Sequence, residues 1–170
     1  MKRMAILTAL ILLIFMDAFA QDVEPAAPKS SLAARSGYVS AGFSGGFMVD
    51  PDMTAGAVNL DYYVTDEVSV GPYFHIGGAG RNSYWGVSGQ VKFSAPLAGS
   101  SNIRPYGTMG IGFIELDFED MDDPKTIYFF PVSGGLEFEL TDMLSFDAGA
   151  MFNITEDTFA GLTIGLRVLL

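Results

Sequence analysis

Apolar and polar residues alternate with a period of two along most of the chain, from residue 37 onward. Such alternation is typical of β-strands, and no segment here sustains the period of an amphipathic helix. Eight segments carry the pattern: 37–48, 54–64, 68–78, 84–95, 103–115, 127–140, 144–153 and 159–170. They exceed the usual length of about five or six residues in globular sheets. They are long enough to cross a bilayer, for which a tilted strand needs about 9–11 residues.

The two faces of these segments differ in chemistry. One register is apolar and carries no charged residue, as at Ile103, Met109 and Ile111, whereas the other holds Ser, Asn, Asp, Glu and most of the strand Gly. A soluble barrel would turn the apolar register inward, and a membrane barrel turns it outward toward lipid. The small residues of the polar register suit a crowded interior, which favours the membrane arrangement.

Aromatic residues stand near many strand ends on the apolar register, as in the two interfacial girdles of membrane barrels. They are Phe47, Tyr62, Phe74, Trp85, Phe93, Phe113, Tyr128, Phe138 and Phe152. Because backbone polar groups in lipid must all be paired, the sheet must close on itself. We therefore predict an all-β fold, a closed eight-stranded antiparallel up-and-down transmembrane β-barrel.

Two prolines, Pro72 and Pro131, fall within the predicted strands. A proline cannot donate to the strand ladder, and a closed barrel has no free edge at which to place it. We therefore expect β-bulges or shifted strand limits at both positions.

The first residues differ from the rest of the chain. Lys2 and Arg3 precede an apolar run, which is followed by a small-x-small site that ends at Ala20. This order is typical of a cleaved secretory signal peptide, and the run is shorter than the roughly 20 residues of a membrane-spanning helix. We predict a signal peptide over 1–20, a flexible lead-in over 21–36 and the barrel over 37–170.

Composition narrows the function classes. Of the 170 residues, 49% are hydrophobic, 17% are charged and 20 are Gly. Nine Lys and Arg against 20 Asp and Glu give a net charge of -11, which excludes nucleic acid as a partner. The chain has no Cys and therefore no disulfide, although an exported protein would be free to form one.

Thr-Asp pairs mark two short turns, at Thr65-Asp66 and Thr141-Asp142, where both side chains can bond nearby backbone groups. With the signal peptide, the eight strands and a strand at the C-terminus, this pattern resembles the small outer-membrane β-barrel family. That family includes the transmembrane domain of outer membrane protein A and related short barrels. The resemblance covers about 37–170.

The resemblance implies an integral protein of the Gram-negative outer membrane, a monomer surrounded by lipid and lipopolysaccharide. It also implies the outer-membrane assembly machinery as a partner. Members of the family commonly end in Phe, which that machinery reads, whereas Leu170 stands in this position here. This departure bears on the efficiency of assembly and not on the fold.

Opposite charges lie on the polar register, and an eight-stranded barrel is just wide enough for its own side chains. They are Asp61, Lys92, Arg104, Glu137, Glu139, Asp147 and Arg167. Because an unpaired buried ion is costly, we interpret them as a structural network of ion pairs and water. A narrow gated pore is the sharper alternative.

His75 is the single histidine, so any acyl-transfer chemistry of the lipid A-modifying kind would have to use it as the base. Ser44, Ser83 and Ser88 are the candidate nucleophiles. A lone histidine on a lumen face is more often a structural residue, so we predict that the protein is not an enzyme. We expect no cofactor.

The densest run of acids lies in the predicted loop between the fifth and sixth strands. Its carboxylates are a weak candidate site for Ca²⁺ or Mg²⁺, without the spacing of an EF-hand. They are Asp117, Glu119, Asp120, Asp122 and Asp123. A solvated acidic loop is the simpler interpretation.

Four functional hypotheses follow from the sequence. The first is a structural or interaction barrel of the outer membrane with a filled lumen. The second is a small porin-like channel for small solutes, and the third is a lipid A-modifying enzyme that uses His75. The fourth is a soluble periplasmic barrel with inverted faces.

Overall fold

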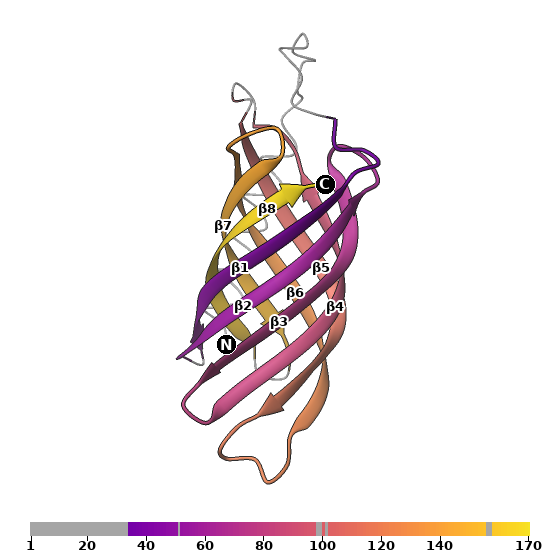
Figure 1. Cartoon of the computed structure of the whole chain (residues 1–170). Coiled ribbons are helices and arrows are strands. Elements are labelled where there is room, and N and C mark those ends of the chain that lie inside the picture. Colours follow the sequence, from indigo (N-terminus) through magenta and orange to yellow (C-terminus); the bar gives the residue numbers. More distant parts are fainter. Residues whose placement is uncertain (1–33, 51, 98–99, 101, 156–157) are drawn as a thin grey trace, which may run out of the picture. The chain divides into compact units, whose positions relative to one another are not determined.

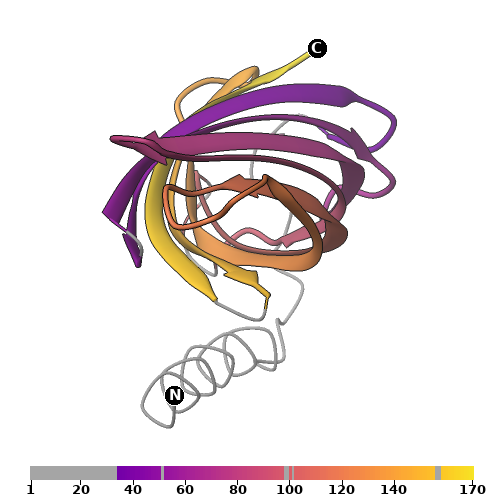
Figure 2. The same ribbon diagram turned by 90° about the horizontal axis from the view of Figure 1, so that it is seen from below.

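Eight antiparallel strands close into a barrel in the computed structural model, which describes residues 34–50, 52–97, 100, 102–155 and 158–170. The strands are β1 (Val39–Asp50), β2 (Asp52–Tyr63), β3 (Val68–Ala79), β4 (Asn82–Ser94), β5 (Ile103–Asp117), β6 (Lys125–Glu139), β7 (Leu144–Ile154) and β8 (Phe159–Leu169). Each pairs with its sequence neighbours, and β8 pairs with β1 (Figures 1 and 2). This confirms the predicted fold class.

The described residues belong to a compact unit that runs from Leu32 to Leu170. The signal-peptide prediction, and the lead-in prediction up to residue 33, lie outside the described residues. Within the part of the chain that the structure describes, no helix is long and apolar enough to cross a membrane.

The two ends of the barrel differ, and we name them by what they carry. The loop end carries the connections that follow β1, β3, β5 and β7. The terminal end carries the turns after β2, β4 and β6 and the C-terminal end of β8, and it is at the top of Figure 1. All strands except β8 reach one or two residues further at the loop end than the alternation predicts, because ladder pairs such as Ala79 with Asn82 and Leu116 with Lys125 continue there.

The internal prolines do not shift the strand register. The β2–β3 ladder is interrupted at Pro72 and the β5–β6 ladder at Pro131, and each resumes in the same register. A proline lacks only its own N–H, so its other neighbouring strand still pairs with it, as Gly89 of β4 does with Pro72. The expectation of bulges or shifted limits at these prolines is therefore wrong. A register shift occurs instead between Met48 and Asp50, where β1 pairs with β8.

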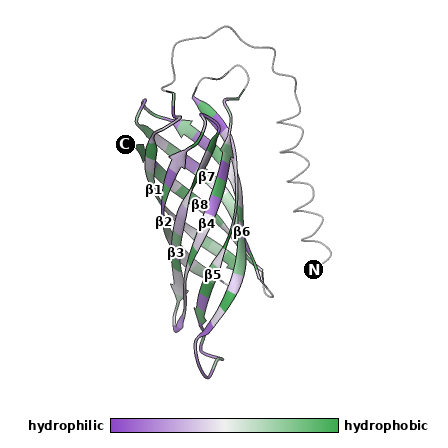
Figure 3. Ribbon diagram, turned by 90° about the vertical axis from the view of Figure 1, so that its right-hand side faces the viewer, coloured by the Kyte–Doolittle hydropathy of each residue, from purple (hydrophilic) through white to green (hydrophobic). Residues whose placement is uncertain are grey.

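The apolar register points outward on all eight strands. Large side chains on this surface are well exposed, for example Met109 at 57%, Ile111 at 59% and Tyr128 at 80%. Hydrophobic residues alternate with polar ones along the strands in Figure 3. An apolar surface that surrounds the whole barrel is far larger than a soluble monomer tolerates, so this face fits lipid. The structure therefore supports the membrane arrangement over the soluble barrel with inverted faces.

The interior has two layers. Buried charged side chains fill the terminal end, and a cluster of buried apolar side chains fills the loop end. The apolar cluster consists of Met48, Met53, Tyr84, Ile114, Leu116, Phe129, Met151 and Phe159. The candidate functional groups therefore lie inside the barrel, between the charged layer and the apolar cluster, and at the two ends of the barrel.

Candidate functional site

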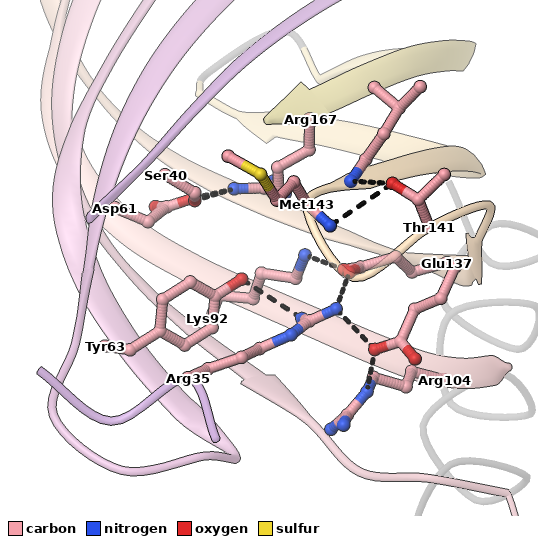
Figure 4. A network of polar contacts seen from close by, with 12 residues as sticks. Arg35, Ser40, Asp61, Tyr63, Lys92, Arg104, Glu137, Thr141, Met143 and Arg167 are labelled. Atoms are coloured by element: carbon pink, nitrogen blue, oxygen red, sulfur yellow. Dashed lines mark hydrogen bonds and ion pairs between the residues drawn. The ribbon is translucent and has the colours of Figure 1, made fainter. Parts of the chain in front are cut away.

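The charged layer at the terminal end centres on Glu137 of β6, which is fully buried. Lys92 of β4 donates to one carboxylate oxygen of Glu137 at 2.5 Å, and Arg35 donates to the other at 2.6 Å (Figure 4). Arg35 also donates to Glu139 at 2.7 Å, and Arg104 of β5 donates to the same oxygen at 2.6 Å. Alternation along β6 turns both glutamates into the lumen, where these cations converge.

A second ion pair joins the first two strands to the last. Arg167 of β8 bonds to Asp61 of β2 and donates to the hydroxyl of Ser40 on β1 at 3.2 Å. Asn59 donates to the Asp61 carboxylate at 2.5 Å. Because β1 lies between β8 and β2, this pair spans the point where the barrel closes.

Asp147 lies beside these pairs without joining them. Within the described residues its carboxylate forms no ion pair, and it lines a cavity of about 60 Å³ with Lys92, Tyr106 and Arg167. One buried water needs about 10–15 Å³ of such space. The cavity therefore has room for several waters between the charged layer and the apolar cluster.

The structure brings together in ion pairs six of the seven residues predicted for the lumen network, and places the seventh, Asp147, beside them. Sequence reasoning missed Arg35, which was assigned to the lead-in. The charge balance of the lumen could have pointed to Arg35. The inward face of the strands supplies three cations, Lys92, Arg104 and Arg167, against four carboxylates. A basic residue just before the first strand was available to supply the missing cation.

Arg35 is held at the terminal end although it precedes β1. Its side chain is 8% exposed. Burial by itself lowers the pKa of Arg35, but the negative charge of Glu137 and then of other neighbours outweighs burial, so the pKa is raised. Arg35 therefore remains a cation among the carboxylates it bonds.

The apolar cluster at the loop end was not foreseen, since the inward register was interpreted as polar and small. Ile114 and Phe129 are completely buried there. Phe118 and Ile127 pack against the same cluster from the β5–β6 hairpin. These residues occupy inward positions by simple alternation. Following the inward register to the ends of the strands would therefore have predicted the cluster.

His75 lies among aromatic rings rather than beside a nucleophile. It is completely buried and stacks on Phe129 with 5.0 Å between ring centroids. Within the described residues, neither ring nitrogen has a hydrogen-bond partner, so no hydrogen bond joins His75 to Ser44, Ser83 or Ser88. The arrangement lacks the base–nucleophile contact that acyl transfer requires.

The acidic residues of the β5–β6 loop stay at the surface. Glu119 pairs with Arg81 at 3.1 Å, and both side chains are more than half exposed. The backbone N–H of Glu119 donates to Asn82 at 2.9 Å, which ties this loop to the β3–β4 turn. Among the residues that the structure describes, no three acidic or histidine side chains are arranged to hold a metal ion.

Solved structures with the same fold include small outer-membrane barrels. The N-terminal β-barrel domain of OprF from Pseudomonas aeruginosa has a TM-score of 0.66 at 15% identity. The match covers 81% of this chain and 100% of the OprF domain. Neisserial surface protein A has a TM-score of 0.60 at 17% identity, with 80% and 98% covered. Ail of Yersinia pestis has a TM-score of 0.53 at 14% identity, with 78% and 97% covered.

No curated protein matches the chain. The family model described as the outer membrane protein beta-barrel domain matches residues 6–168. That match spans nearly the whole chain, and the OprF barrel and neisserial surface protein A support it at the level of the fold. The chain belongs to the outer membrane protein β-barrel family and is an integral protein of the bacterial outer membrane.

Proposed function

We propose that this protein is a structural or interaction barrel of the outer membrane, with a lumen that is closed to solute flow. The observation that carries the proposal is the apolar cluster at the loop end. Ile114 and Phe129 fill the lumen there without exposed surface. Close-packed apolar side chains leave no path for hydrated ions.

The charged layer supports the same function from the other end. Except for Asp147, its cations and carboxylates are bonded to one another, as in the contacts of Glu137 with Lys92 and Arg35. A pore for ions needs charged groups that a passing ion can reach, and these groups are occupied. The space between the layers suits trapped water rather than a continuous channel.

The β5–β6 hairpin at the loop end is the surface best placed to contact a partner. Its strands are 15 residues each, longer than the other six, and its tip extends furthest at that end (Figure 1). Bonds from Glu119 to Arg81 and Asn82 hold the tip against the neighbouring turn. A projecting hairpin whose tip contacts the neighbouring turn offers a defined surface for a partner.

The charge of this hairpin restricts its partners. Asp117, Glu119, Asp120, Asp122 and Asp123 face few basic residues nearby. One related structure contains Ail of Yersinia pestis in complex with the heparin analogue sucrose octasulfate. Like charges repel, so a polyanion of that kind does not suit the acidic loop end here. The proposed partners remain lipid and lipopolysaccharide on the outward face, with the chain a monomer after insertion by the assembly machinery.

Conductance in planar lipid bilayers tests the closed lumen. We expect the wild-type barrel to show no steady ionic current. Truncating the two completely buried side chains of the apolar cluster, in the variant Ile114→Ala with Phe129→Ala, should raise the frequency of conducting events. The matched control carries Ile111→Ala with Phe130→Ala on the outward face and should behave like wild type.

A large steady current through wild type would refute the closed lumen and support the porin-like channel. No current in any of the three proteins would place the barrier in the charged layer instead of the apolar cluster.

A further inference from the structure

Residues 34–38 lie at the terminal end just before β1, and we call them the strap. The backbone N–H groups of Arg35 and Ser36 both donate to one carboxylate oxygen of Asp66, at 2.7 and 2.9 Å. Gly37 donates to the carbonyl of Tyr63 at 2.9 Å and has a φ of +85°, in the left-handed region that glycine adopts easily. This turn sends the Arg35 side chain into the lumen.

The Arg35 guanidinium occupies a cup of acceptors. It donates to Glu137 at 2.6 Å, to Glu139 at 2.7 Å and to the hydroxyl of Tyr63 at 3.1 Å (Figure 4). The guanidinium carbon also lies 5.4 Å from the centre of the Tyr63 ring, within the range of a cation–π contact. Two carboxylates, a hydroxyl and a ring face match the planar fork of a guanidinium better than they match an ammonium.

The charge count explains why the cup needs a cation. Inward side chains of the strands supply Lys92, Arg104 and Arg167, and the carboxylates Asp61, Glu137, Glu139 and Asp147. The strands alone therefore carry one negative charge in excess within the lumen. Arg35 brings the count to four cations and four carboxylates, and an uncompensated buried charge is costly.

The backbone of the strap is tied to the barrel on one side, toward β2 and the β2–β3 turn, although the Arg35 side chain lies deep in the lumen. Gly37 and Tyr38 continue the pairing of β1 with β2, since Gly37 donates to the carbonyl of Tyr63 and the N–H of Tyr63 donates to the carbonyl of Tyr38. Toward β8, the described backbone bonds end at Val39, which accepts from Leu170. The backbone of the strap is anchored through Asp66 in the β2–β3 turn and through Tyr63. A segment that is tied on one side only can open locally while the closed sheet stays intact.

We propose that the strap is a releasable plug, and that the cup of Tyr63, Glu137 and Glu139 is a guanidinium-binding site open to solvent from the terminal end when Arg35 leaves. The cup would then accept a guanidinium group supplied from outside the chain, such as an arginine side chain of a partner protein at the terminal end. The apolar cluster at the loop end stays closed throughout. The site is therefore a one-sided pocket and does not make the barrel a channel.

A single cysteine reports on the plug, because the natural chain contains none. Ser145 is 95% buried and lines the groove beside Arg35, so the variant Ser145→Cys places a thiol of nearly the same size next to the strap. Ser88→Cys is the control, since Ser88 is also buried but belongs to β4 on the inward face, outside that groove. The folded barrel in detergent is treated with a charged, water-soluble thiol reagent, and a heat-shift gel confirms folding.

Arg35→Ala removes the plug and should raise the labelling rate of the Ser145→Cys protein by about tenfold or more, the scale expected for lost charge-assisted hydrogen bonds. Asp66→Ala removes the anchor but keeps the guanidinium, so we expect a smaller rise. Glu67→Ala, in the same turn and without contact to the strap, should leave the rate unchanged. Ser88→Cys should stay unlabelled in every background.

Guanidinium itself tests the cup. Added at a concentration far below that which unfolds the barrel, guanidinium chloride should slow labelling in the Arg35→Ala background, whereas tetramethylammonium chloride should not. Equal labelling with and without Arg35→Ala would overturn the plug, as would labelling of Ser88→Cys that rises together with Ser145→Cys. Equal protection by the two salts, or none by guanidinium, would overturn the guanidinium site.

Discussion

At the scale of single residues, Glu137 is the acceptor on which the lumen ion pairs converge. It is fully buried and bonds both Lys92 and Arg35. Two cations on one buried carboxylate mean that its loss would leave both without their closest counter-charge. The sequence places Glu137 in the lumen by alternation alone, but it does not identify Arg35 as a partner, because the two residues are 102 positions apart.

We predict that Glu137→Gln lowers the free energy of unfolding by about 3–5 kcal/mol, the cost of removing one partner of a buried ion pair. The shape of the side chain is kept, so the loss reports on charge. Urea titration of the barrel in lipid vesicles, followed by heat-shift gel, measures it.

The control for this prediction is Glu119→Gln. Glu119 forms an ion pair with Arg81, but both side chains are exposed to water. Exposed pairs contribute little, so we expect a change within about 0.5 kcal/mol. Similar losses for the two substitutions would show that the lumen network does not stabilise the barrel.

At the scale of elements, the strands of this barrel depend on close approach at inward glycines. A Cβ on Gly135 of β6 would collide with the backbone of Ala148 and Gly149 on β7. Gly89 of β4 faces outward, and a Cβ there would meet no atom within 4 Å. The abundance of Gly in the sequence indicates a crowded lumen, but only the structure separates the positions that require Gly from those that tolerate a side chain.

We expect Gly135→Ala to destabilise the barrel by about 1–3 kcal/mol, as overpacking does in a close-packed interior. Gly89→Ala should leave stability unchanged or raise it by about 0.4–1 kcal/mol, because alanine restricts the unfolded chain. The midpoint of urea unfolding compares the two variants with wild type. A larger loss for Gly89→Ala than for Gly135→Ala would contradict the assigned faces.

The sequence predicts the elements well because alternation is a local property of each strand. The limits agree within two residues, and both registers point where the pattern places them. Pro72 and Pro131 show the limit of reasoning from one strand at a time. The effect of each proline depends on which neighbouring strand would have accepted a hydrogen bond from the N–H that proline lacks. The pairing of the strands determines which neighbour loses the hydrogen bond, and the sequence of a single strand does not show this pairing.

At the scale of the whole molecule, barrel closure determines the parts of the site that sequence reasoning missed. The loop-end cluster combines inward residues of several strands, among them Met48, Ile114, Phe129 and Met151, which look isolated when each strand is considered separately. Arg35 likewise gains its partners only once β6 is placed opposite the start of β1. The seven predicted lumen residues were found because charge on an otherwise small and uncharged face is visible in each strand.

The central claim is that the apolar register faces lipid and the lumen is filled. Fractionation of cells, followed by gels of unheated and heated samples, tests it most directly, because a closed membrane barrel stays folded in detergent until heated. We predict that the protein appears in the outer-membrane fraction and migrates faster before heating than after it. Recovery in the soluble periplasmic fraction without detergent would contradict the account, since the apolar face would then have to lie inside.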